Sequence, residues 1–107
     1  ERTESNVLMD SSLKLMKVFL SPNTNPGPGI FEVSEDDSGA LFCTCKNFKA
    51  RNACKHAMFV QTRIDANNGI YPLEISSRAT KSDADEAKKS LQAFRDFVIR
   101  FGRIEVF

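Results

Sequence analysis

The chain has 107 residues, of which 27% are charged and nine are glycine or proline (5 and 4), with a formal net charge of +1 at pH 7. This composition is typical of a soluble globular domain and argues against a disordered chain. No apolar run approaches the roughly 20 residues that span a bilayer, and the first residues lack the basic and apolar regions of a signal peptide. We therefore expect an intracellular single domain over residues 1–107, with no membrane contact.

The first predicted element is a strand over residues 13–20. The apolar stretch 7–21 fits parts of both the helical and the extended period, and we favour the strand for its second half. The next nine residues, "SPNTNPGPG" at 21–29, contain three of the four prolines and two of the five glycines. This composition predicts a loop.

A β-hairpin is predicted next. "IFEV" at 30–33 and "LFCTC" at 41–45 are rich in β-prone residues, and the segment between them has acidic residues and Gly39, which suit a turn. Because side chains along a strand alternate with period two, Cys43 and Cys45 should lie on the same face of the second strand.

The pattern changes to a helical period at Asn52. Ala53, Ala57, Val60 and Ile64 recur at helical spacing. We expect Asn52 to cap this helix, which places Cys54 and His56 in its first turn, and Gly69 to end it.

A longer helix is predicted over residues 82–101, with Ser82 as its cap and Gly102 at its end. One apolar stripe runs along it: Ala84, Ala87, Leu91, Phe94, Val98 and Phe101. The stripe can pack on the domain's own sheet or form a docking face for a partner. The last five residues, "RIEVF", alternate and predict a short strand. The fold class is therefore α+β.

All three cysteines and the only histidine lie within residues 43–56. An odd number of cysteines argues against a disulfide framework, whereas Cys43, Cys45, Cys54 and His56 form a Cys₃His set of the kind that binds structural zinc. The alternatives are a redox or catalytic thiol and unrelated buried thiols. We predict one Zn²⁺ ion on these four residues.

The spacing C-x-C-x8-C-x-H, with "GIFEVSEDDSGALF" before it and "AMFV" after it, resembles a SWIM-type zinc finger over about residues 30–62. The resemblance implies a hairpin that leads into two ligands, a connecting loop, and a helix that begins near the other two. It places Cys43, Cys45, Cys54 and His56 on the ligand positions and Phe48 on an apolar position, within a finger core of about 30–66. SWIM-type fingers are associated with DNA binding and with protein contacts in larger nuclear, recombination and transposition-related proteins.

The positive charge is local to this window. Between Cys43 and Ile64 there are five basic residues and no Asp or Glu. We expect four of them to contact the phosphates of a nucleic acid, DNA more than RNA: Lys46, Lys49, Arg51 and Lys55. The alternatives are a solvated loop and a protein-interaction module within a larger assembly. We expect no enzyme activity, because the sequence offers no second histidine as a base and no phosphate-binding glycine loop.

Overall fold

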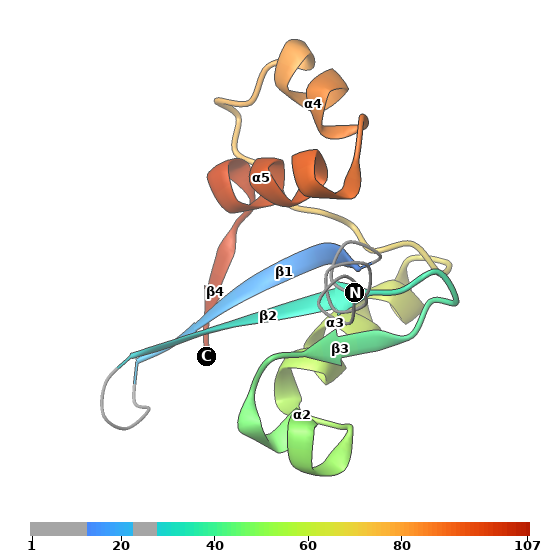
Figure 1. Ribbon diagram of the computed structural model, residues 1–107, viewed down its shortest axis with the longest axis vertical. Helices are drawn as coiled ribbons and strands as arrows, with labels where there is room; N and C mark the ends of the chain where they lie inside the picture. Colours follow the sequence, from blue (N-terminus) through green and yellow to red (C-terminus); the bar gives the residue numbers. More distant parts are fainter. Residues whose placement is uncertain (1–12, 23–27) are drawn as a thin grey trace, which may run out of the picture.

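The computed structural model describes residues 13–22 and 28–107. In this part of the chain a four-stranded sheet lies between two groups of helices (Figure 1). The strands are β1 (Lys14–Ser21), β2 (Gly29–Glu35), β3 (Leu41–Cys43) and β4 (Ile104–Val106), in the spatial order β3-β2-β1-β4. The predicted α+β class is confirmed.

β2 and β3 form the predicted hairpin and pair antiparallel, with Val33 opposite Cys43. The Asp36 carboxylate holds the turn, because its Oδ1 accepts hydrogen bonds from the amides of Ser38 at 2.9 Å and Ala40 at 3.0 Å. Gly39 supplies a φ of +89°, which glycine adopts at little cost.

β1 is an inner strand of the sheet and lies between β2 of the hairpin and the C-terminal strand β4. It pairs antiparallel with β2 and parallel with β4, and its residues 15–19 are all buried. Burial on both faces explains why this segment reads as a nearly continuous apolar run instead of a clean alternation. The strands predicted at 13–20 and in the last five residues are confirmed, while residues 7–12 and 23–27 lie outside the described residues.

Helices α4 (Lys81–Ala87) and α5 (Leu91–Phe101) lie on one side of the sheet (Figure 1). The prediction of one continuous helix capped by Ser82 was wrong. The first helix begins after Thr80, whose side chain and that of Asp83 form a reciprocal capping box. A second cap interrupts the helical segment, because the Ser90 hydroxyl accepts a hydrogen bond from the Ala93 amide at 3.0 Å.

The apolar stripe of this segment packs on the protein's own sheet. Val98 is buried together with Leu15 and Val18 of β1, and Phe94 packs against the same cluster. At the edge of this contact Arg95 donates two hydrogen bonds to the Glu32 carboxylate of β2, at 2.6 and 2.9 Å. The first of the two alternatives for the stripe therefore holds for its central part.

Helices α2 (Lys46–Arg51) and α3 (Lys55–Ala66) lie on the other side. The segment expected to be a connecting loop contains the six-residue helix α2. The prediction of Asn52 as an N-cap was wrong. Asn52 is the C-cap of α2 and adopts the left-handed conformation with φ 57°. Cys54 takes the N-cap position of α3 instead, and its sulfur accepts a hydrogen bond from the Ala57 amide at 3.3 Å.

The main core lies between α3 and the sheet. Its buried members include Phe19 of β1, Val33 of β2, and Val60 and Ile64 of α3, and they share one cluster with the three cysteines. The cysteine site is thus part of the core and not an appended loop. Among the described residues, none of the helices is long and apolar enough to cross a membrane.

Candidate metal centre

Three elements, β3 and the N-terminal ends of α2 and α3, bring the four candidate ligands to one place. Cys43 ends β3, and Cys45 follows it in extended conformation (φ −77°, ψ 163°) at the N-cap of α2. This outcome corrects the expectation that Cys45 lies within the strand, although the extended backbone still turns both side chains to the same side. The left-handed Asn52 then ends α2 and reverses the chain, so that Cys54 and His56 return to the hairpin at the start of α3.

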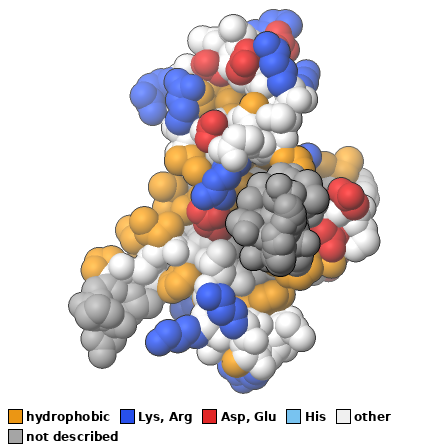
Figure 2. All heavy atoms as spheres, viewed as in Figure 1, with side chains coloured by type: hydrophobic (Ala, Val, Ile, Leu, Met, Phe, Trp, Pro, Cys, Tyr) orange, Lys and Arg blue, Asp and Glu red, His pale blue; other side chains and the backbone are white. Residues whose placement is uncertain are grey.

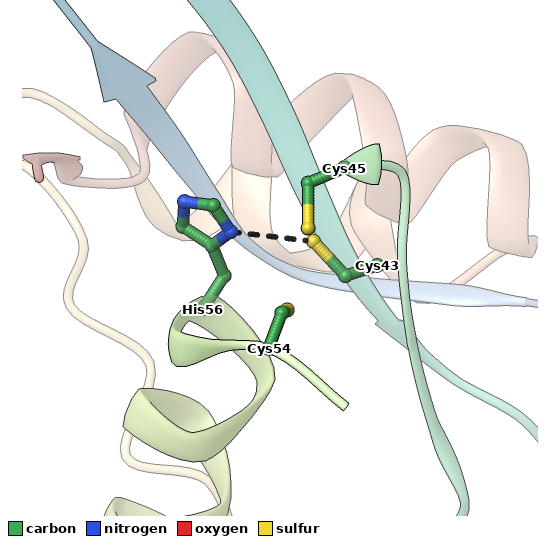
Figure 3. Close-up of side chains that lie close together, drawn as sticks. All are labelled: Cys43, Cys45, Cys54 and His56. Carbon is green, nitrogen blue, oxygen red and sulfur yellow. Dashed lines mark hydrogen bonds between the residues drawn. The ribbon is translucent and has the colours of Figure 1, made fainter. Parts of the chain in front are cut away.

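The ligand atoms of these residues face one another (Figure 3). The three sulfurs and a ring nitrogen all lie within 4.8 Å of one another, and all four residues are buried. The Cys43 sulfur is 3.6 Å from Nδ1 of His56. Tetrahedral zinc with Zn–S near 2.3 Å and Zn–N near 2.0–2.1 Å requires ligand-to-ligand distances of about 3.5–3.8 Å. The cluster is therefore close to the size that a zinc ion needs.

The electrostatics of the thiols differ between positions. Burial raises the pKa of the Cys43 thiol to about 12, and the neighbouring thiols of Cys45 and Cys54 add to this rise. Burial acts on Cys45 in the same direction, but the backbone N–H groups of Phe48 and Asn47 and the adjacent thiols reverse it, so that its pKa is lowered. Zinc binds the thiolate form, so a bound cation would favour deprotonation of all three.

The surroundings of His56 favour the neutral imidazole, which is the form that binds metals. Burial and the charge of Lys55 lower its pKa, which favours the neutral imidazole. The ring lies among the rings of three phenylalanines from three strands or their ends: its centroid is 4.9 Å from that of Phe19, 5.3 Å from Phe31 and 5.8 Å from Phe107. Nδ1 faces the sulfurs, whereas Nε2 is buried without a hydrogen-bond partner among the described residues.

The donor set and the burial of these residues fit a structural metal site better than a redox or catalytic thiol or a group of unrelated buried thiols. The three cysteines are free thiols, and three buried thiols and an imidazole that meet at one point are not unrelated apolar residues. Three thiolates and one imidazole make a closed Cys₃His set, which is a recognised type of structural zinc site. The arrangement could bind zinc, and it lies where the hairpin, α2 and α3 meet.

A comparison with known protein families identifies this class of site. Residues 17–63 match the family described as the SWIM zinc finger. The resemblance seen in the motif is thus confirmed, and the match extends it from the hairpin back into β1. No curated protein and no solved structure matches the chain.

The four predicted phosphate-binding residues are all exposed. Lys46, Lys49 and Arg51 lie on α2, and Lys55 is the first residue of α3, directly before the ligand His56. None of the four forms an ion pair with a described residue. The surface around α2, in the lower part of Figure 2, shows Lys and Arg side chains and no Asp or Glu.

The sequence reasoning missed the aromatic surroundings of His56. Phe19 and Phe107 stand on the neighbouring parallel strands β1 and β4 or at their ends, and their ring centroids are 5.4 Å apart. The alternation in the final segment was a usable signal for a strand, but nothing in a single sequence shows which strand it pairs with.

Proposed function

We propose that this chain is a zinc-binding module that binds nucleic acid, DNA in preference to RNA, without catalysis. Cys43, Cys45, Cys54 and His56 hold one Zn²⁺ ion, and Lys46, Lys49, Arg51 and Lys55 contact phosphate groups around it. The observation that supports this function is the position of the four cations: two short segments carry them, and the metal ligands flank both segments.

Formal charges favour an anionic partner. A zinc ion with three thiolates and a neutral imidazole carries a net charge of about −1, and five basic residues from Lys46 to Arg63 outweigh it. Because the four phosphate-binding candidates have no acidic partner among the described residues, their charge is available to a polyanion. The DNA preference rests on the resemblance to SWIM-type fingers.

The absence of catalysis follows from the ligand set in the same proposal. Four protein ligands fill the tetrahedral positions of zinc, so no position remains for a water molecule that the ion could activate. The metal then holds α2 and α3 in place and takes no part in a reaction.

The test is a double substitution, Lys49→Ala with Arg51→Ala, in the zinc-loaded protein. Binding to oligonucleotides of different sequence should weaken to a similar extent, and the dependence of log K on log salt concentration should flatten by about 0.7–0.9 for each lost phosphate contact. Zinc content should stay unchanged, because neither residue is a ligand. Fluorescence anisotropy at several salt concentrations measures both effects.

The matched control is Lys88→Ala with Lys89→Ala, which removes two exposed cations from the far end of the molecule. This control should leave the salt dependence nearly unchanged. If the α2 variant binds as well as the parent, or if the parent binds no oligonucleotide at low salt, the basic surface is only a solvated one.

A protein-interaction module is the second candidate, and one observation favours it. Three aliphatic side chains form a row across three strands on the α5 side of the sheet, because the half-buried Leu20 is directly opposite both Ile30 and Val106. Ile30 is 68% exposed and Val106 is 63% exposed, and Figure 2 shows hydrophobic side chains on this part of the surface. A pull-down with the intact chain and with Ile30→Asp tests this candidate.

A further inference from the structure

A hollow of about 570 Å³ lies between α3 and the end of β4, beside the metal centre. Seven residues line it: Lys55, Met58, Phe59, Thr62, Arg63, Ala66 and Phe107. Its volume falls in the range of about 300–1,000 Å³ that is usual for ligand sites. None of the described residues that line it is acidic.

Two aromatic rings and two cations define the chemistry of the hollow. The Lys55 ammonium is 5.3 Å from the centroid of the Phe107 ring, and the Arg63 guanidinium carbon is 4.1 Å from that of Phe59. Met58 adds an exposed, polarisable thioether, with 66% of its surface accessible. A partner that fits must therefore offer a flat or apolar group and at least one negative charge.

The hollow is continuous with the basic surface of the proposed function. Lys55 belongs to both, and it precedes the ligand His56, whose ring lies 5.8 Å from that of Phe107. Lys55 and Phe107 therefore both lie next to the candidate metal ligand His56. A nucleic-acid strand whose phosphates follow α2 toward Lys55 therefore meets positively charged side chains along its whole path to the hollow.

We propose that this hollow binds an unpaired base of a single-stranded nucleic acid, with the adjacent phosphates on Lys55 and Arg63. The inference rests on the proposed function and adds to it a preference for single strands. In a duplex the bases are stacked and paired inside, and only the phosphates could reach this surface. The strength of stacking on an aromatic side chain depends little on which base is stacked. This agrees with the proposed phosphate contacts, which do not distinguish between bases.

The experiment compares three probes of equal length on the zinc-loaded chain: a single-stranded oligonucleotide, the same backbone with abasic sugars, and the duplex. The parent should bind the single strand about ten-fold or more tightly than the abasic chain, since base stacking contributes this much in proteins that bind single strands. A 2-aminopurine base in the single strand should lose fluorescence on binding, which a phosphate contact alone would not cause.

Met58→Asp removes the thioether and places a carboxylate in the hollow. Ile70→Asp is its matched control, because Ile70 is 69% exposed, does not line the hollow, and gives the same change in net charge. Met58→Asp should abolish the preference for the single strand over the abasic chain, and Ile70→Asp should keep it. Both side chains are exposed, so the zinc content of each variant should equal that of the parent.

Two results would overturn the inference in different ways. If the parent binds the abasic chain as tightly as the single strand, while Lys49→Ala with Arg51→Ala still weakens both, the hollow binds no base and the proposed phosphate contacts stand. If the parent binds none of the three probes but an acidic peptide with aromatic residues binds and is lost in Met58→Asp, the hollow serves a protein partner and the proposed function fails with it.

Discussion

Lys17 is a charged residue in the middle of the most buried strand. Its side chain is 3% exposed, and its ammonium lies 3.4 Å from the Glu74 carboxylate and 3.3 Å from that of Glu105. The Phe59 ring is 5.9 Å away. Burial of an ion costs several kcal/mol, and two carboxylates that are themselves partly exposed offset this cost without adding much net stability.

We therefore expect Lys17→Met to change the free energy of unfolding by less than about 1 kcal/mol, or to raise it, because methionine fills a similar volume without an ion to desolvate. Glu74→Gln with Glu105→Gln should lower it by on the order of 3 kcal/mol, since a buried ammonium then lacks a counter-charge. Urea unfolding of the two variants measures the difference. A loss as large in Lys17→Met as in the double variant would mean that the ion pairs themselves stabilise the fold.

At the scale of single residues, the sequence was sufficient to predict which side chains form the candidate metal site. The four metal-binding side chains are of types that have few other reasons to cluster, so their proximity along the chain was enough to predict their proximity in space. Capping residues were harder. Asn52 and Ser82 were both predicted as N-caps, yet Cys54 and Thr80 occupy those positions. Several polar residues in a row can each cap, and only the tertiary contacts select among them.

At the scale of elements, the junction between α5 and β4 depends on Gly102. Its φ of −72° is accessible to any residue, but a Cβ placed there would lie 2.6 Å from the Val98 carbonyl oxygen. The same carbonyl accepts the Gly102 amide hydrogen bond at 2.8 Å, so the chain leaves the helix in close contact with its last turn.

Gly102→Ala should consequently lower the free energy of unfolding by about 1–3 kcal/mol, the usual cost of overpacking. The comparison is Gly69→Ala, where the strain comes only from a φ of +89° and the added methyl meets nothing within 4 Å. Thermal unfolding of both variants tests the argument. A neutral Gly102→Ala would show that the end of α5 shifts freely and that close contact at Val98 is not required.

The elements that were predicted correctly share a local cause. The hairpin has β-prone runs and a turn that its own residues close, and the last strand has a clear alternation. The break between α4 and α5 was missed because the apolar stripe continues across it, and the capping serine at 90 is a polar residue of a kind that also occurs within helices. The helix α2 was missed because six residues carry too little periodicity to be seen.

At the scale of the whole molecule, helices cover β1 on both faces of the sheet. Each group of helices buries the side chains of only one face, so both groups are needed to bury β1. Leu15 is 1% exposed and packs with Val98 from the segment after residue 77, while Phe19 is fully buried by the core on the α3 side. Which helix covers which face, and that β4 pairs parallel with β1, depends on contacts between residues far apart in the sequence. A single sequence does not contain that information in a local pattern.

A chain truncated after Ser77 should for this reason aggregate or fold poorly. The truncation removes β4 and α5, exposes the aliphatic side of β1, and leaves an unpaired edge strand. Dispersion of the amide signals in an NMR spectrum, together with the zinc content, measures the outcome. If the truncated chain folds and binds zinc normally, the C-terminal segment, about 82–101, is not required for the single domain expected here. That segment would then belong to a partner interface.

The most direct test of the account is a metal analysis of the purified chain, combined with removal of the metal by a strong chelator. We expect one zinc ion per chain, and its removal should unfold the finger, because the binding free energy of such sites, about 10–16 kcal/mol, is also folding free energy. Cys54→Ser should lose the ion, whereas Lys49→Ala should keep it. Substoichiometric zinc, or a circular dichroism spectrum that is indifferent to the chelator, would contradict the claim that Cys43, Cys45, Cys54 and His56 form a structural zinc centre.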